Sequence, residues 1–309
     1  MQTTLQTPVI ISGTGLHTGS PARVTLRSAA AGTGVVFRRL DVTDRDPLVP
    51  ALWDRVAQLP LNTRIVNAAG VSVSTIEHLM AALAGTGLRN AVVEIDGPEV
   101  PILDGSAAPW VQAILGAGLA VQDAPLEVIE ILAPVEVRDG LASARLEPSP
   151  VPEMSFAIDF PDAAIGHQEK SLALSNGTFL RELCDSRTFC RQADVDMMRA
   201  KGLALGGTYL NAVVVDGARV LTPGGLRHPD EAVRHKMLDA FGDLYTAGAP
   251  ILGRYVGRRS GHALTNRLLR ALFAQPEAWR RVPCDPARLA LLPGAGVRAT
   301  DLADLPAVA

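Results

Sequence analysis

The stretch STIEHLMAALAGTGLRNAVVEIDG, residues 74–97, predicts a helix followed by a strand. Ser74 and Glu77, three residues apart, have the form of a capping box at a helix start, and Gly85 is a typical C-terminal stop. The β-branched run in residues 90–97 indicates the strand. This helix is the first clear one in the chain, so the order of elements around it decides the fold class.

Strand patterns precede this segment. Residues 7–40 contain three β-branched runs (PVIISG, ARVTLRS and TGVVFRR) separated by Gly- and Ser-rich turns, which predict an antiparallel meander. We expect an irregular excursion at residues 41–62, because three prolines fall there. Residues 63–74 then predict a hairpin, and residues 101–119 predict a turn that leads into a second helix.

The same order returns in the second half of the chain. After a linker-like stretch at residues 121–128, strand patterns restart in EVIEILAPVEVRD, ASARLEP and MSFAIDF. Beyond a mixed region around residues 178–219, RHKMLDAFGDL (residues 234–244) predicts a helix, and residues 254–275 predict a strand or loop running into another. Several strands followed by two helices in each half favour an α+β fold of two similar two-layer domains, each a mainly antiparallel sheet packed on two helices.

The length of 309 residues suits two domains of ordinary size. The predicted division is an N-terminal α+β domain at 1–122 with an insert at about 41–62, a C-terminal α+β domain at 127–283 with an insert at about 186–219, and a C-terminal arm at 284–309. The arm is predicted from its prolines, Pro286, Pro293 and Pro306.

Composition narrows the class of protein. A net charge of −3 argues against binding to a nucleic-acid backbone, and 48% hydrophobic residues indicate a globular chain. The three cysteines lack CxxC spacing and indicate a reducing compartment. The sequence shows neither a signal-peptide pattern nor an apolar run of about 18 residues. We therefore expect a cytoplasmic monomer without a transmembrane segment.

The helix predicted at residues 234–244 has a divided surface. His235, Asp239 and Asp243 follow one another at intervals of four residues and form a narrow polar stripe opposite an apolar arc. His235 and Asp239 lie one turn apart, so both can point at one ion, and both residue types are Zn²⁺ ligands. A surface ion pair has the same spacing, and the pair alone leaves both interpretations open.

Two further segments contain residues of the same kind. Glu77 and His78 are adjacent, so their side chains diverge by about 100° on a helix and can serve different roles at one metal. On spacing alone the other explanation is favoured, a helix cap for Glu77 and a half-buried imidazole for His78. His262, in RSGHALTN, can act as an acid or base near neutral pH, or simply start a helix. Thr188 in DSRTFC has no mechanism visible from spacing.

Common nucleotide and protease motifs are missing from the sequence. SGTGLHTG at residues 12–19 is Gly-rich but lacks the GxGxxG spacing, and no GxxxxGK[ST], HExxH or GxSxG occurs. A dinucleotide-binding fold, a P-loop and a serine hydrolase elbow are therefore not expected.

The quoted segments together resemble one family. SGTGLHTG, STIEHLMAALAGTGLRNAVVEIDGPEVPILDGSAAPWV, SRTF, LRHPDEAVRHKMLDAFGDL and SGHALTNRLL follow its order over nearly the whole chain. The chain is similar to the zinc-dependent UDP-3-O-acyl-N-acetylglucosamine deacetylases of lipid A synthesis. This resemblance implies two similar α+β domains, each with an insert, with the active site between them. It also implies that the second insert forms an apolar tunnel for the acyl chain.

The resemblance assigns a role to each candidate residue. It implies one Zn²⁺ per chain, held by His78, His235 and Asp239. It implies catalytic roles for Glu77 as general base, His262 as acid, Asp243 as the carboxylate that orients His262, and Thr188 as the hydroxyl that steadies the oxyanion. It also implies substrate-binding roles for Lys236, Arg259, Phe189 and His17, with Lys236 near the diphosphate.

The implied function is hydrolysis of the N-acetyl group of an acylated UDP-N-acetylglucosamine, the committed step of lipid A biosynthesis. No nucleic acid is expected as a partner, and membrane contact is expected only as a transient surface contact. Two alternatives stay open: a catalytically degenerate binding module of the same fold, and a zinc amidohydrolase with a water-soluble substrate. Three departures from the family pattern, Arg191, Ala204 and Arg259, leave the shape of the tunnel and the hydrogen bonds at its mouth open.

Overall fold

The computed structural model describes residues 1–59 and 61–304. Two five-stranded sheets dominate it. The first has the order β2-β3-β9-β4-β5, with β2 (Val9–Thr14), β3 (Pro21–Ser28), β4 (Val35–Arg39), β5 (Leu48–Pro50) and β9 (Ala91–Ile95). The second has the order β12-β13-β20-β14-β15, with β12 (Val135–Asp139), β13 (Ala142–Glu147), β14 (Glu153–Asp159), β15 (His167–Ala173) and β20 (Arg254–Arg258).

The two sheets have the same topology. In each, the first two strands form an antiparallel hairpin, and the strand that comes last in the chain lies at the centre. That central strand pairs in parallel with its other neighbour, β4 for β9 and β14 for β20. The predicted α+β fold of two similar halves with mainly antiparallel sheets is therefore confirmed.

The predicted meander at residues 7–40 is wrong in one respect. β2 and β3 form a hairpin, but β3 does not pair with β4, because β9 lies between them. A parallel neighbour needs a long crossover connection, which here passes through a helix. A pattern of short strands and turns carries no information about such a distant insertion.

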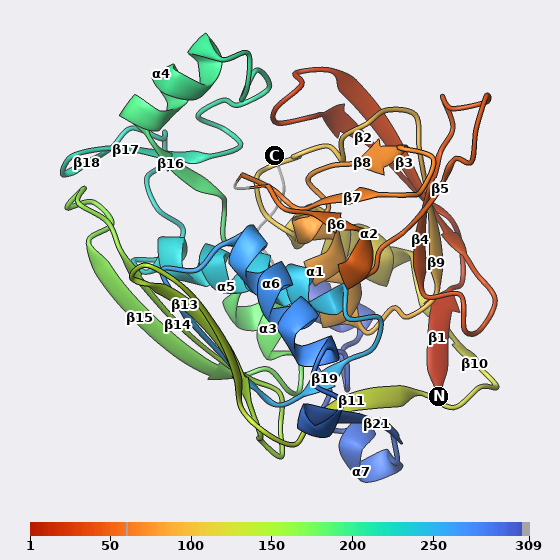
Figure 1. Ribbon diagram of the computed structural model, residues 1–309. Coiled ribbons are helices and arrows are strands. Elements are labelled where there is room, and N and C mark those ends of the chain that lie inside the picture. The colour runs from red at the N-terminus through yellow and green to blue at the C-terminus, as the bar shows by residue number, and fades with distance from the viewer. Residues whose placement is uncertain (60, 305–309) are drawn as a thin grey trace.

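Four helices lie between the sheets. They are α1 (Glu77–Thr86), α2 (Ala108–Ala117), α5 (Glu231–Tyr245) and α6 (His262–Phe273). Figure 1 shows α1, α5 and α6 at the centre of the molecule, with the sheet of β13–β15 on the left and the sheet of β3, β4 and β9 on the right. α1 and α5 are buried over nearly their whole length, and one hydrophobic cluster is continuous through both halves.

The capping box predicted at Ser74 and Glu77 is wrong. α1 begins at Glu77, no side chain caps it, and the Glu77 carboxylate instead accepts a hydrogen bond from the backbone of Thr63. The helix also passes through Gly85 and ends before Gly87, whose φ of +82° forms the left-handed cap. Gly85 is needed for another reason, because a Cβ there would lie 2.0 Å from the ring of Phe179.

Smaller elements complete the fold. The bounds of the paired strands and short helices are β1 (Gln2–Leu5) with β10 (Leu119–Gln122); β11 (Glu127–Ile131) with β19 (Ile251–Leu252) and β21 (Trp279–Pro283); and α3 (Thr178–Glu182), α7 (Pro286–Leu289) and the 3₁₀ segments Trp53–Arg55, Pro276–Ala278 and Ala299–Asp304. Pro306 and the end of the predicted arm lie outside the described residues.

Each half carries one additional small sheet. The first consists of β6 (Val56–Ala57), β7 (Arg64–Val66) and β8 (Ser72–Val73), and it contains the predicted hairpin. The second consists of β16 (Phe189–Arg191), β17 (Val213–Asp216) and β18 (Arg219–Val220), together with α4 (Gln192–Ala200). β5 belongs to the main sheet, so the stretch at 41–62 is only partly an excursion. α4 and its sheet stand apart from the main body at the upper left of Figure 1.

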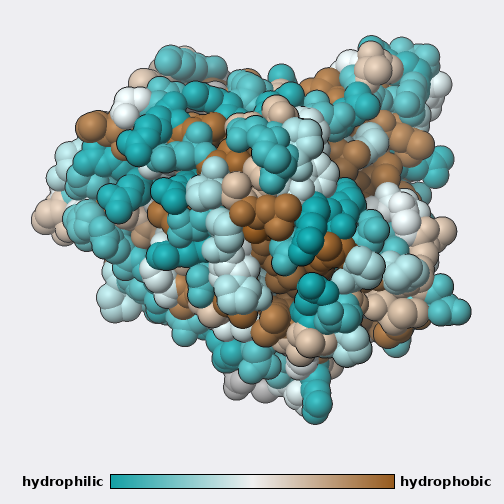
Figure 2. Space-filling view, turned by 60° about the horizontal axis from the view of Figure 1, so that its bottom comes forward, coloured by the Kyte–Doolittle hydropathy of each residue, from teal (hydrophilic) through white to brown (hydrophobic). Residues whose placement is uncertain are grey.

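The outer surface contains both hydrophilic and hydrophobic residues. Figure 2 shows a face that is largely hydrophilic, with hydrophobic residues in separate patches. Over the residues that the structure describes, no helix has the length and hydrophobicity needed to cross a bilayer.

Candidate active site

Three buried side chains from two helices meet next to the start of α1. His78 lies in the first turn of α1, and His235 and Asp239 lie one turn apart on α5. Their ligand atoms all lie within 4.8 Å of one another, and the two imidazole rings stand edge to face. His235 and Asp239 were predicted as a pair from their spacing and His78 from the family resemblance, and the structure places all three together.

The hydrogen bonds around these groups leave their metal-binding atoms available. His235 Nδ1 lies 3.0 Å from the carbonyl oxygen of Ser186. Because a carbonyl only accepts, Nδ1 carries a proton, and Nε2 is the ring nitrogen left to face a metal, as in metal-binding histidines. His235 Nε2 and His78 Nε2 lie 3.2 and 3.4 Å from Asp239 Oδ1. This oxygen is buried and accepts no hydrogen bond from any described residue.

The protonation states also suit a cation. Burial lowers the pKa of His78, which keeps the imidazole neutral. For Asp239, burial alone would raise the pKa, but His235 and Lys236 outweigh it and hold the pKa well below its usual value. Two imidazole nitrogens and an ionised carboxylate oxygen form a donor set that fits Zn²⁺. A buried oxygen without a hydrogen bond is explained if a cation occupies this position.

Glu77 lies beside this group. Its carboxylate is buried, and Oε2 accepts a hydrogen bond of 3.0 Å from the backbone N–H of Thr63. Burial raises the pKa of Glu77 to about 7, because the charged form is poorly solvated there. A carboxylate with a pKa near 7 is suited to take a proton in neutral solution.

His262, at the first position of α6, forms the second proton-transfer group. Its Nδ1 lies 2.9 Å from Asp243 Oδ2, and its Nε2 lies 3.8 Å from Asp239 Oδ2. Burial alone would lower the pKa of His262, but the Asp243 carboxylate outweighs it and raises the pKa to about 9. Between pH 7 and 9, Glu77 is therefore ionised while His262 is protonated, which gives one base and one acid at the same site.

A cavity of about 560 Å³ opens beside these groups. Eight of the eleven predicted site residues line it: His17, Thr188, Phe189, His235, Lys236, Asp239, Arg259 and His262. The other three, Glu77, His78 and Asp243, are buried and interact with residues of this lining. The structure thus brings all of the predicted residues together.

The predicted substrate-binding residues have different partners. Lys236 Nζ donates a 2.7 Å hydrogen bond to Asp239 Oδ2, so its charge faces this carboxylate as well as the cavity. Arg259 forms an ion pair with Asp159 at the rim. His17 presents both ring nitrogens without a hydrogen bond to a described residue. Phe189 lies edge to face with the ring of His235.

The cavity continues under α4 and the small sheet of β16–β18. Its lining there is mainly apolar and includes Phe160, Val195, Met197, Met198, Ala212 and Val214. Arg191 also lines it but is turned to Asp162, with which it forms an ion pair of 2.5 Å. Ala204 lines it with a φ of +53°. The second insert therefore supplies one wall of the cavity.

Several residues that support the site were not predicted. Thr63 donates hydrogen bonds to both Glu77 and Asp243. Glu99 accepts hydrogen bonds from the backbone N–H groups of His17 and Thr18 at 2.8 Å each, which fixes the turn that follows β2. These bonds join segments far apart in sequence, and no local pattern in the chain indicates them.

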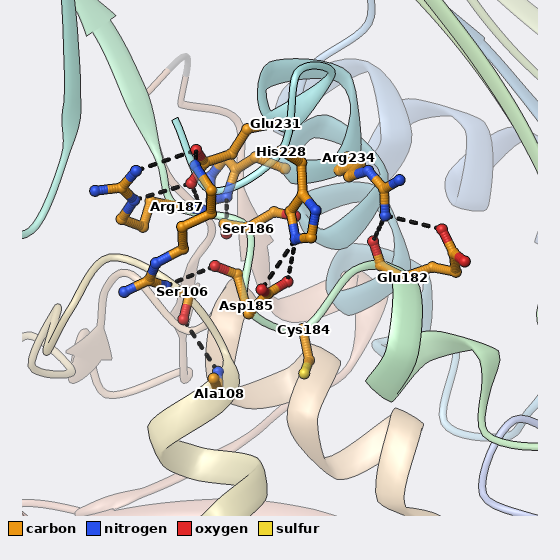
Figure 3. A network of polar contacts seen from close by, with 12 residues as sticks. Ser106, Ala108, Glu182, Cys184, Asp185, Ser186, Arg187, His228, Glu231 and Arg234 are labelled. Atoms are coloured by element: carbon orange, nitrogen blue, oxygen red, sulfur yellow. Dashed lines mark hydrogen bonds and ion pairs between the residues drawn. The ribbon is translucent and has the colours of Figure 1, made fainter. Parts of the chain in front are cut away.

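A buried network also holds the carbonyl of Ser186 against α5. Arg187 donates from its backbone N and from Nε to Glu231 Oε1, the first residue of α5, at 3.0 and 2.9 Å. His228 lies 2.9 Å from Asp185. Figure 3 shows Ser186 between these two contacts. Because Ser186 accepts from His235, the network fixes the orientation of the His235 ring.

Comparison with known proteins gives a consistent result. The family model described as "LpxC: UDP-3-O-acyl N-acetylglycosamine deacetylase" matches residues 2–274. A protein of Phenylobacterium zucineum (strain HLK1), named UDP-3-O-acyl-N-acetylglucosamine deacetylase, is 52% identical over 279 residues, which cover 90% of this chain and 95% of that relative. A protein of the same name from Shewanella oneidensis is 46% identical over 285 residues, 91% of this chain and 92% of that relative.

Proposed function

Because this chain belongs to the LpxC family of UDP-3-O-acyl N-acetylglycosamine deacetylases, we propose that it hydrolyses the N-acetyl group of UDP-3-O-acyl-N-acetylglucosamine. The products are UDP-3-O-acyl-glucosamine and acetate, and the reaction is the committed step of lipid A biosynthesis. The observation that carries this proposal is the buried Asp239 Oδ1, which accepts no hydrogen bond from a described residue and faces His78 and His235, next to a base and an acid.

One Zn²⁺ per chain would be held by His78, His235 and Asp239. When bound there, Zn²⁺ supplies Lewis acidity, which polarises a carbonyl group and makes water more acidic. The remaining steps belong to the side chains around it.

Glu77 serves as the general base. Its pKa of about 7 leaves it ionised at mildly alkaline pH, and it accepts a proton from the water that attacks the acetamide carbonyl. A new C–O bond forms, and negative charge develops on the carbonyl oxygen. The hydroxyl of Thr188, which lines the cavity, stabilises this charge by donating a hydrogen bond.

His262 serves as the general acid. Asp243 keeps it protonated and fixes its ring, so its Nε2 proton faces the reaction site. As the C–N bond breaks, His262 donates this proton to the leaving amine, and acetate is released. The positive charge of His262 before this step also stabilises the negative charge on the carbonyl oxygen.

The rest of the cavity binds the substrate. Lys236 and Arg259 supply positive charge for the diphosphate, and His17 offers ring nitrogens that lack a protein partner. Phe189 and the apolar residues under α4 contact the acyl chain. This division of polar and apolar lining favours an acylated substrate over a water-soluble one.

We propose the same division of the chain as above: domains at 1–122 and 127–283, inserts at about 41–62 and 186–219, and an arm at 284–309. The repeated strand order of the two sheets supports it. All three cysteines are free, which supports a cytoplasmic location. We also propose that the protein is a monomer that contacts the membrane surface only transiently.

The test is a deacetylation assay with acyl chains of several lengths, combined with metal analysis of the same sample. We expect acetate release that requires an acylated UDP-sugar, close to one zinc per chain, and loss of activity with a chelator. Full activity after the metal has been removed, or no activity on any acylated UDP-sugar, would refute the proposal. A Glu77→Gln variant with the turnover of the wild type would show that the reaction does not take place at this site.

A further inference from the structure

All three polar groups of Thr63 form hydrogen bonds with residues of α5 or with residues at the start of α1. It is buried, at 2% exposure, directly before β7. Its backbone N–H donates to Glu77 Oε2 at 3.0 Å, and its carbonyl accepts from the N–H of Ile76 at 3.3 Å. Its hydroxyl donates to Asp243 Oδ1. One residue thus contacts the start of α1 and the far turn of α5.

These bonds form a chain from the proposed base to the proposed acid. Glu77 Oε2 accepts from Thr63, Thr63 donates to Asp243 Oδ1, and Asp243 Oδ2 accepts from His262 Nδ1. Glu77 and Asp243 are both carboxylates, so a direct contact between them would be repulsive. Thr63 connects them because it offers a donor to each.

We propose that Thr63 is a positioning residue that fixes the general base and the carboxylate of the general acid relative to each other. The proposal rests on the proposed function, because it assumes that Glu77 and His262 exchange protons with the substrate. Thr63 is not among the described residues that line the cavity, so it acts through Glu77 and Asp243. Proton-transfer groups lose rate when their geometry is loosened by a fraction of an ångström.

The decisive variant is Thr63→Val. Valine has nearly the same shape and keeps both backbone hydrogen bonds, so only the donor to Asp243 is lost. We expect kcat to fall about 10- to 100-fold, the usual effect of losing a hydrogen bond to a charged group. KM should stay within about twofold, because substrate contacts are unchanged. Thr63→Ser, which restores the hydroxyl, should recover most of kcat, and zinc content should equal that of the wild type in both.

The matched control is Thr86→Val. Thr86 is the last residue of α1, is buried to the same degree, and donates from its hydroxyl to the carbonyl of Ala82 at 2.8 Å. It lies about 13 Å along the helix from Glu77, at 1.5 Å per residue. We expect the control to keep the wild-type kcat, so that a loss in Thr63→Val cannot be attributed to a buried hydroxyl in general.

A double-mutant cycle tests the route through Asp243. If Thr63 acts by fixing this carboxylate, Thr63→Val should reduce kcat little further in an Asp243→Asn background. If the Thr63→Val variant does not fold, Thr63→Ala is used in its place, and its thermal unfolding is measured together with its kcat. A wild-type kcat in these variants, additive effects in the cycle, or a serine variant as slow as the valine one would overturn the inference. An active Glu77→Gln would instead overturn the proposed function itself.

Discussion

A Cβ atom at Gly242 would lie 2.0 Å from the backbone carbonyl oxygen of Glu77. α5 therefore crosses α1 so closely that only glycine fits at the crossing point. Gly242 follows Asp239 by three residues and directly precedes Asp243 on α5. The close crossing is thus what places the carboxylates of one half of the chain beside Glu77 and His78 of the other half.

Gly242→Ala should separate the two helices. Because the obstructing atom is backbone, a small movement of a side chain cannot relieve the contact, and we expect a loss of about 1–3 kcal/mol in the free energy of unfolding. Zinc affinity should fall as well, since His78 moves away from His235 and Asp239. Denaturant unfolding and metal titration measure the two effects.

Gly116→Ala is the control for this substitution. Gly116 lies inside α2, and a Cβ there meets no atom within 4 Å. Alanine in an open helical position should stabilise the protein by about 0.5–1 kcal/mol and leave zinc binding unchanged. If Gly242→Ala behaves in the same way, the close crossing is not needed for the site.

Metal binding and turnover should separate in variants of neighbouring residues. His235→Ala removes a proposed ligand and should lower the zinc content of the purified protein. Glu77→Gln keeps the ligands but removes the base, so zinc should stay bound while kcat falls about 10²–10⁴-fold. His167→Ala, at an exposed histidine on β15, is the control and should change neither quantity. A zinc-free Glu77→Gln protein would contradict this assignment of roles.

The periodicity of the sequence predicted much of the fold and part of the site. It located the four helices between the sheets, the first hairpin and the two similar halves, because amphipathic patterns and turns are local signals, but it did not indicate α3, α4 or α7. It also placed His235 and Asp239 on one helical face. It could not indicate the position of β9 between β3 and β4, which depends on a crossover connection.

The buried contacts that hold the site residues in place could not be predicted from the sequence for a related reason. Thr63 and Asp243 are 180 positions apart, yet they share a hydrogen bond. Glu77 had a plausible local explanation as a helix cap, but its carboxylate is used in a tertiary contact instead. Local patterns predict the elements, whereas the buried polar contacts between elements depend on how those elements pack.

The pH dependence of kcat should be bell-shaped. The rate should rise as Glu77 loses its proton, at or below the pKa of about 7, because a bound divalent cation further favours the carboxylate. It should fall as His262 loses its proton near pH 9. Asp243→Asn removes the charge that raises the pKa of His262, so the alkaline limb should move to lower pH. Asp41→Asn, at a surface pair with Arg39, should leave both limbs in place.

Breaking the buried ion pair of Arg187 and Glu231 should lower the free energy of unfolding far more than breaking a surface ion pair. Their side chains are only 8% and 1% exposed, and Arg187 outweighs the burial that would otherwise raise the pKa of Glu231, so this pKa is lowered. Arg187→Met leaves the carboxylate buried without its partner and should cost about 3–5 kcal/mol of unfolding free energy. Denaturant unfolding at several pH values measures this cost.

The stabilisation by the Arg187–Glu231 pair should decrease as the pH falls. A carboxylate with a lowered pKa stabilises the fold above its unfolded pKa, and that contribution disappears as the pH falls through the folded value. The contribution of this carboxylate to wild-type stability should therefore be full near pH 7 and shrink below about pH 4.3. Arg267→Met removes an exposed pair with Asp139 and should cost less than about 1 kcal/mol. Equal costs for the two variants would show that the buried network does not stabilise the fold around His235.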